Sequence, residues 1–167
     1  MKVVILQILW HTETSKREWK MRSKIELIKV KAIVVEDPDL FYLGKYSNTP
    51  KEGAIEVNRK GYYKYFNPAC REYADLDYER MKGYNNGDWY MIGIIAEAEV
   101  SYKIGNYSRL EFFSSSGIWD IESDSDKDYL NELKEEELID LKAHLEQFNV
   151  DISNFEELSK DIEIEWE

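Results

Sequence analysis

An apolar stripe near the C-terminus constrains the fold of this chain more than any other feature. Its members are leucines and one phenylalanine at spacings of three to five residues: Leu130, Leu133, Leu138, Leu141, Leu145 and Phe148. Apolar residues at this spacing lie on one face of an α-helix, which must be buried against another element. We expect Ser125 or Asp126 to cap this helix and Asn149 to end it.

Alternating segments elsewhere predict the sheet on which this helix packs. Residues 24–36 and 89–102 alternate apolar and polar side chains over much of their length, as half-buried strands do. The first half of 89–102 is apolar on both faces, which indicates a central strand covered on both sides. Shorter strands are expected at 40–43, 54–57, 62–66, 109–113 and 162–166, a loop at 45–53, and helices at 71–82 and 155–160, the latter capped by Ser153.

These elements predict an α+β fold. An antiparallel sheet of five to seven strands is expected to pack against the long acidic C-terminal helix, with one or two short helices beside it. Gly83 is expected to end the helix at 71–82. A length of 167 residues fits a single domain over 1–167, with residues 1–20 either part of it or an N-terminal appendage.

Composition excludes several classes of protein. One cysteine excludes an internal disulfide scaffold, and two histidines leave little room for a zinc site. The apolar run Val3–Trp10 is shorter than the roughly 20 residues needed to span a membrane, and no cleavage site follows it. We therefore expect a cytoplasmic protein without a membrane partner.

Acidic charge is concentrated at the C-terminal end. Residues 119–167 hold 18 acids and 4 bases, whereas the rest of the chain is nearly neutral. Such a charge asymmetry is typical of a protein that binds a partner with a basic surface. It is equally typical of a protein whose acidic face serves only to keep it in solution. For the first alternative, the candidate partner-binding residues are Glu132, Glu135, Glu136, Glu137, Asp140 and Glu146.

A tyrosine-rich basic segment favours a different function. Tyrosine rings beside lysine and arginine can stack on single-stranded bases, although the same pattern fits a plain strand face. The candidate nucleic-acid-binding residues here are Arg59, Lys60, Tyr62, Tyr63, Lys64 and Tyr65.

Other motifs give weaker signals. The acids of 120–128 do not fit a calcium loop and are interpreted as helix capping, with a cation site as the alternative. Ser114–Gly117 either forms a backbone nest for an anion or is a plain loop. His144 is expected to pair with Asp140, and Cys70 to be buried or inert. With no nucleophile beside a base and no phosphate-binding glycine loop, we expect no enzyme activity, no cofactor and no metal.

Residues 117–130 read GIWDIESDSDKDYL and lead into the acidic stretch from Glu135. This segment resembles the C-terminal end of small, uncharacterised acidic phage and prophage proteins, which typically show G-x-W-G-I-E-S-D-S-D before an acidic helix. Residues 62–68 and 86–93 are similar to upstream segments of that group, so the likeness covers roughly 60–148. Asp120 stands where the group has glycine. The resemblance implies a mobile-element origin and brings no catalytic residues.

Together these observations predict an accessory protein of a phage or mobile element. We expect it to bind and inhibit a host factor in an infected or lysogenic bacterium, as anti-defence and anti-CRISPR proteins do. The acidic surface would occupy a basic nucleic-acid-binding groove, which makes direct nucleic-acid binding the less favoured reading. The alternative is a nucleic-acid-binding accessory module that uses the tyrosine-rich segment.

Overall fold

A computed structural model describes residues 23–37, 42–57, 62–104 and 106–166. The elements expected before residue 23 lie outside these ranges, as do Arg59 and Lys60. The described chain divides into two compact units. The first unit holds the described residues up to Ile33, Ile94–Gly117 and Asn131 onwards, and the second holds the described parts of Val34–Gly93 with Ile118–Leu130.

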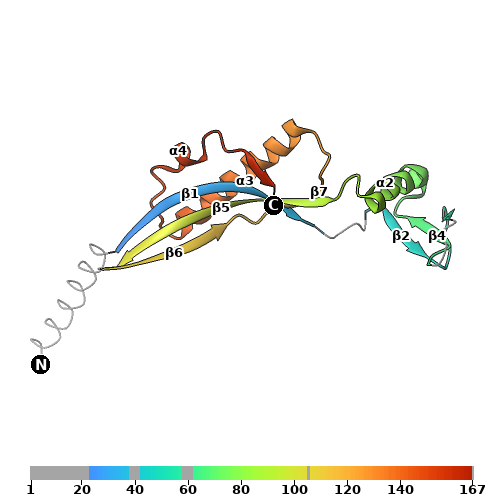
Figure 1. Ribbon diagram of the computed structural model, residues 1–167, viewed down its shortest axis with the longest axis horizontal. Helices are drawn as coiled ribbons and strands as arrows, with labels where there is room; N and C mark the ends of the chain where they lie inside the picture. The colour runs from blue at the N-terminus through green and yellow to red at the C-terminus, as the bar shows by residue number, and fades with distance from the viewer. Residues whose placement is uncertain (1–22, 38–41, 58–61, 105, 167) are drawn as a thin grey trace, which may run out of the picture. The chain divides into compact units, whose positions relative to one another are not determined.

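The described residues form a mixed α+β structure (Figure 1). In chain order its elements are β1 Ser23–Glu36, β2 Gly44–Ser47, β3 Ile55–Glu56, β4 Tyr65–Pro68, the 3-10 turn η1 Arg71–Tyr73, α2 Ala74–Asn86, β5 Met91–Ile104, β6 Tyr107–Ser114, β7 Ile118–Glu122, α3 Lys127–Gln147, α4 Phe155–Ser159 and β8 Ile164–Trp166. The long helix and the long strands were predicted from periodicity, and both predictions are confirmed.

The sheet prediction needs two corrections. The strands form two sheets instead of one: a five-stranded sheet ordered β6-β5-β1-β8 with β7 also on β5, and a three-stranded sheet ordered β2-β4-β3. The five-stranded sheet is also mixed, not purely antiparallel. The chain that leaves α3 returns alongside β1 in the parallel sense, where Asp151 bridges Glu26.

The core of the first unit lies between the sheet and α3, which runs along the long strands (Figure 1). On the helix side it consists of Leu138, Leu141 and Leu145. On the sheet side it consists of Leu27, Val30, Ala96, Ala98 and Val100. Burying one leucine side chain contributes roughly 1.5–3 kcal/mol, so the apolar stripe fixes the orientation of α3. The start of β5 is covered on both faces as predicted, since Met91 through Ile94 are all buried.

The second unit has its own core around Phe66, which is fully buried among Leu43, Val57, Met81, Trp89 and Met91. Two short-range predictions fail here. Residues 44–47 form β2, which pairs with β4, instead of a loop, and Tyr42 and Leu43 lie in a turn instead of a strand. Strands of two to four residues carry too little alternation to be located from sequence.

The helix ends also differ from the predictions. Gly83 lies inside α2, and the helix is ended by Gly87, whose φ of 79° is left-handed. The Gly87 N–H bonds the carbonyls of Gly83 and Tyr84, which satisfies groups at the helix end. Asp126 caps α3, since its Oδ1 accepts the Asp128 N–H at 2.8 Å. The residue before α4 is Asn154, not Ser153, and it makes no side-chain capping bond.

Candidate functional site

The exposed side of α3 carries one continuous acidic face. We define it by residues three or four positions apart that are all exposed: Glu132, Glu135, Glu136, Ile139, Ala143 and Glu146. The apolar side chain at its centre, Ile139, is 70% exposed. Glu135 and Glu136 lie one helical turn before Ile139, and Ala143 lies one turn after it, so the face combines an apolar centre with carboxylates on one side of that centre.

Two of the six candidates, Glu137 and Asp140, lie outside the acidic face as defined and make contacts within the fold. Glu137 is only 4% exposed, and its Oε2 accepts the Gly117 N–H at 2.9 Å. Asp140 Oδ2 accepts the Ser116 N–H at 2.8 Å. That backbone hydrogen bond holds the pKa of Asp140 below its usual range. Both carboxylates attach α3 to the loop before β7.

The segment Ser114–Gly117, for which the sequence left a nest or a plain loop open, donates two backbone N–H groups to carboxylates of the protein itself. The backbone N–H groups of Ser116 and Gly117 point at the two α3 carboxylates. His144 joins this contact as expected. Its Nε2 lies 3.9 Å from Asp140 Oδ1, and its Nδ1 lies 3.2 Å from the Ser114 carbonyl oxygen. Residues Ser114–Gly117, called the serine loop below, thus hold α3 in place through these hydrogen bonds.

Two lysines partly neutralise the flanks of α3. Lys134 is buried, and its Nζ donates to the Ile162 carbonyl at 2.9 Å while lying 3.1 Å from Glu135. Lys142 pairs with Glu156 at the start of α4. Within the described part of the chain, the ion pairs include neither Glu132 nor Glu136. Glu146 is also absent from these ion pairs, so three of the four carboxylates of the acidic face form no salt bridge among the described residues.

The tyrosine-rich candidates are only partly gathered at one surface. Tyr62 is 81% exposed, and Tyr63 and Lys64 are also exposed. The ring of Tyr63 stacks on Tyr46, with the centroids 6.3 Å apart. Tyr65 is half-buried within β4. This places three of the six candidates on an accessible surface, with the two basic residues before Gly61 outside the described chain.

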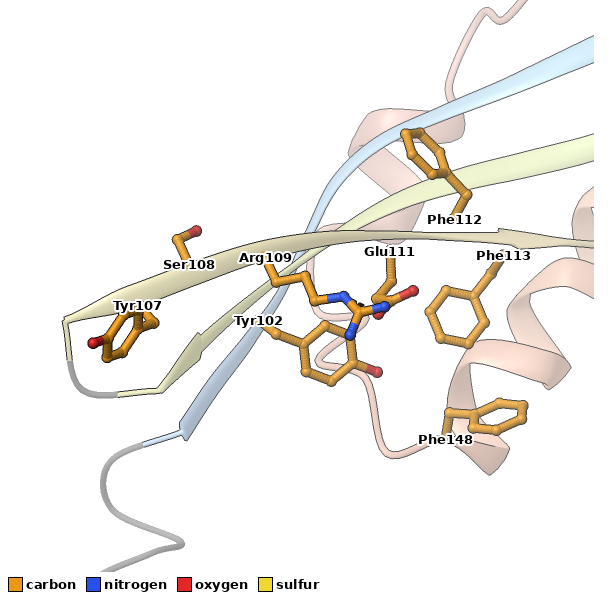
Figure 2. A pocket seen from close by; sticks show the side chains of 8 residues that line it. All are labelled: Tyr102, Tyr107, Ser108, Arg109, Glu111, Phe112, Phe113 and Phe148. Atoms are coloured by element: carbon orange, nitrogen blue, oxygen red, sulfur yellow. Dashed lines mark ion pairs between the residues drawn. The ribbon is translucent and has the colours of Figure 1, made fainter.

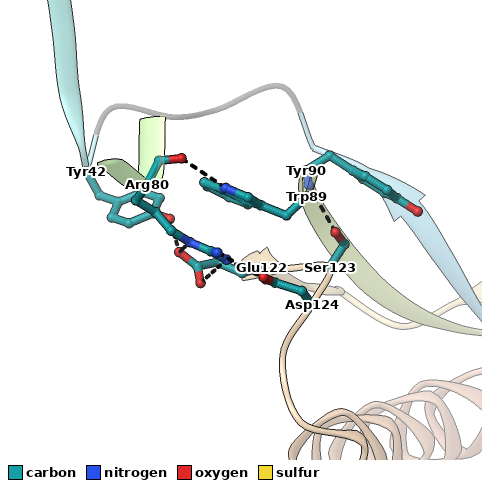
Figure 3. A network of polar contacts seen from close by, with 7 residues as sticks. All are labelled: Tyr42, Arg80, Trp89, Tyr90, Glu122, Ser123 and Asp124. Atoms are coloured by element: carbon teal, nitrogen blue, oxygen red, sulfur yellow. Dashed lines mark hydrogen bonds and ion pairs between the residues drawn. The ribbon is translucent and has the colours of Figure 1, made fainter. Parts of the chain in front are cut away.

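Sequence reasoning missed a polar network centred on Arg80 in the second unit (Figure 3). The Arg80 guanidinium donates to Glu122 at 3.1 and 2.6 Å and to Asp124 at 2.8 Å. It also lies 4.0 Å from the centroid of the Trp89 ring, and the Trp89 Nε1–H donates to the Arg80 carbonyl at 3.0 Å. Tyr42 completes the network by donating its hydroxyl to Glu122.

This network accounts for the central acids of 120–128. The Arg80 hydrogen bond lowers the pKa of Asp124. Burial, followed by the Glu122 carboxylate, raises the pKa of the Tyr42 phenol. Glu122 and Asp124, two of the acids considered for a cation site, are thus both paired with the guanidinium of Arg80 from α2. No cluster of three metal-binding side chains occurs among the described residues.

Cys70 is exposed, not buried. The described histidine, His144, lies in the first unit on α3, and Cys70 belongs to the second unit. The helices that the structure describes include none long and apolar enough to cross a membrane.

No protein-family model matches the chain, and neither the curated proteins nor the solved structures include a significant match.

Proposed function

We propose that this protein binds another protein with a basic surface through the acidic face of α3. The observation that carries the proposal is the separation of the helix acids into two groups. Glu137 and Asp140 are used inside the fold, whereas Glu132, Glu135, Glu136 and Glu146 are left at the surface. Within the described part of the chain, two lysines of α3 interact with this exposed group: Lys134 lies 3.1 Å from Glu135, and the charge of Glu146 helps to raise the pKa of Lys142. Glu132 and Glu136 take part in none of the described ion pairs, so the described contacts do not account for their charge.

The acidic face is rigidly supported. Its helix buries Leu138, Leu141 and Leu145 in the core and is held by two carboxylate bonds to the serine loop. A partner that docks on a preorganised helix does not have to order it, so less binding free energy is lost. With a rise of about 1.5 Å per residue, the face runs for roughly 21 Å from Glu132 to Glu146.

The charge also favours fast association with a basic partner. A net charge of −14 in residues 119–167 produces a field that attracts positive surfaces at low salt. At physiological ionic strength the screening length is about 8 Å, so direct contact is needed for most of the affinity. Ile139 supplies the apolar centre of that contact.

The kind of partner follows from the same features. Carboxylates in a row can stand in for phosphates on a nucleic-acid-binding groove, and the resemblance to phage proteins points to a host factor. The function supported best is therefore inhibition of a bacterial nucleic-acid-handling protein by an accessory protein of a phage or mobile element.

Triple charge reversal on the acidic face is expected to abolish this binding. The variant E132K/E136K/E146K and the wild-type chain are each immobilised and exposed to nuclease-treated bacterial lysate. The wild type is expected to retain a basic protein that elutes at moderate salt, and the variant to retain at least about tenfold less.

The matched control is E157K/E163K/E165K, which makes the same charge change at three exposed acids outside α3. It is expected to capture the same protein as the wild type. Equal capture by the two triple variants would contradict the proposal, since net charge and not the acidic face would then govern binding.

The second candidate function is single-stranded nucleic-acid binding through Tyr62, Tyr63 and Lys64. The observation that favours it is the 81% exposure of Tyr62, which precedes the stacked Tyr63–Tyr46 pair in the chain. Fluorescence anisotropy of a labelled single strand at low salt is expected to rise with the wild type and to rise less with Y62A. Absence of binding up to on the order of 100 µM protein would refute this candidate.

A further inference from the structure

Among the described strands, β6 forms a long outer edge of the five-stranded sheet. Within the described residues its strand neighbour is β5, and it occupies one end of the sheet order. Its sequence, YSRLEFFS, contains no proline, and its two charged side chains, Arg109 and Glu111, have opposite signs and pair with each other. An edge of this kind presents free backbone N–H and C=O groups to another strand.

The register with β5 shows which backbone groups point outward. The Ser115 N–H donates to the Ala96 carbonyl at 2.9 Å, one step beyond the Glu97↔Ser114 pair. Because hydrogen-bonded pairs alternate along an antiparallel ladder, Arg109 and Glu111 also bond toward β5. The backbone N–H and C=O groups that point away from β5 therefore belong to the alternate residues Ser108, Leu110 and Phe112.

The side chains of β6 divide between two faces. Figure 2 shows Ser108 and Phe112 on one side of the strand, and Arg109, Glu111 and Phe113 on the other. On the latter side, Tyr107, Phe113, Tyr102 and Phe148 line an open apolar groove of about 470 Å³. Exposed apolar groups occur on both faces, since Tyr107 is 83%, Phe112 71% and Leu110 51% exposed.

The order of side chains along β6 is complementary to itself. If a second β6 runs antiparallel to the first and Leu110 pairs with Leu110, then Arg109 of each strand lies directly opposite Glu111 of the other. The same register places Ser108 opposite Phe112 and Tyr107 opposite Phe113. In this register the two Leu110 residues face each other as a hydrogen-bonded pair. The outward direction of the Leu110 backbone groups allows this pairing in an antiparallel ladder.

We propose that two copies of this chain join through their β6 edges, antiparallel and centred on Leu110. The two sheets then become one continuous sheet across a two-fold axis. Arg109 and Glu111, which form an ion pair within one strand at 2.6 Å, join a network of four alternating charges. They occupy non-hydrogen-bonded positions, where facing side chains come closest. This inference does not rest on the proposed function, because the acidic face lies on α3.

Charge exchange across the axis tests this register. R109E places four glutamates together, and E111R places four arginines together, so each variant alone is expected to dimerise at least about tenfold more weakly than wild type. An equimolar mixture of the two is expected to dimerise again, since each Glu then faces an Arg. Sedimentation velocity of the full chain over a concentration series measures all three samples.

Two results would overturn the proposal. One is a wild-type chain that remains monomeric up to on the order of 100 µM, well above typical micromolar association. The other is a mixture of R109E and E111R that dimerises no better than either variant. Both substituted side chains are solvent-accessible in the single chain, and circular dichroism verifies that the variants are folded.

Disulfide trapping provides an independent measure of the register. In a C70S background, which removes the exposed native thiol, L110C is expected to form a covalent dimer on mild oxidation. A hydrogen-bonded pair has Cα atoms about 5.5 Å apart, within disulfide range. S108C is the control, because its counterpart lies four residues away along the partner strand, roughly 13 Å. Equal trapping of both variants, or of neither, contradicts the proposed pairing.

Discussion

Leu141→Ala is expected to lower the free energy of unfolding by about 3 kcal/mol, within the 2–5 kcal/mol range of buried leucine truncations. Leu141 is fully buried at the centre of the first unit's core. It packs from α3 among residues of β1 and β5, including Val30 and Ala98. The substitution removes buried apolar surface and leaves a cavity. Because the strands and the helix relax only partially into this cavity, most of the lost stability is not recovered.

Urea unfolding followed by tryptophan fluorescence and circular dichroism measures this effect. The matched control is Leu76→Ala, the same chemical change at a side chain that is 69% exposed. It is expected to change stability by no more than about 0.5 kcal/mol. If the two variants unfold at the same urea concentration, Leu141 is not a core residue and the packing of α3 on the sheet is wrong.

This contrast also separates stability from binding. The acidic face is formed by exposed residues on the opposite side of α3 from Leu141. Conditions in which L141A remains folded should therefore leave binding intact, whereas E132K/E136K/E146K should lose binding without losing the core. The two variants together distinguish a helix that only supports the fold from one that also recognises a partner.

The sequence predicts the elements whose pattern is local and long. The leucine stripe of α3 and the alternation in β1 and β5 extend over many residues, so a single period dominates each segment. Each of these predictions is confirmed. The short strands β2, β3 and β4 give no such pattern, and their pairing joins residues that are 9 to 24 positions apart in the sequence.

The roles of Glu137 and Arg80 illustrate what was missed and why. Glu137 lies four residues from both Leu133 and Leu141, which places it on the buried side of the helix. That spacing distinguishes Glu137 from the exposed acids of the helix, whereas its charge alone does not. Arg80 gave no such signal, because its carboxylate partners are 42 and 44 residues away in sequence.

Arg80→Ala is expected to lower the free energy of unfolding by about 2 kcal/mol. Loss of one partner from a fully buried ion pair costs roughly 3–5 kcal/mol, and the 30% exposure of the Arg80 side chain reduces this through solvent screening. The variant leaves Glu122 and Asp124 without their guanidinium and removes the stacking of Arg80 on Trp89. Both effects act within the second unit.

The loss should depend on pH with a definite sign. Arg80 lowers the pKa of Asp124 in the folded protein, so this carboxylate stabilises the fold above its unfolded pKa of about 4. That stabilisation disappears as the pH falls through the lower, folded pKa. The difference in stability between wild type and R80A is therefore expected to be largest at neutral pH and to shrink in acid.

Urea unfolding of both chains at pH 7 and pH 3 measures this difference. Arg71→Ala is the control, because Arg71 pairs with Glu52 at a site where both side chains are mostly exposed. Such pairs contribute less than about 1 kcal/mol. If R71A costs as much as R80A, or the R80A loss is the same at both pH values, the charges around Arg80 do not stabilise the second unit. Its stability would then come from the apolar cluster around Phe66, with the polar network a consequence of the packing.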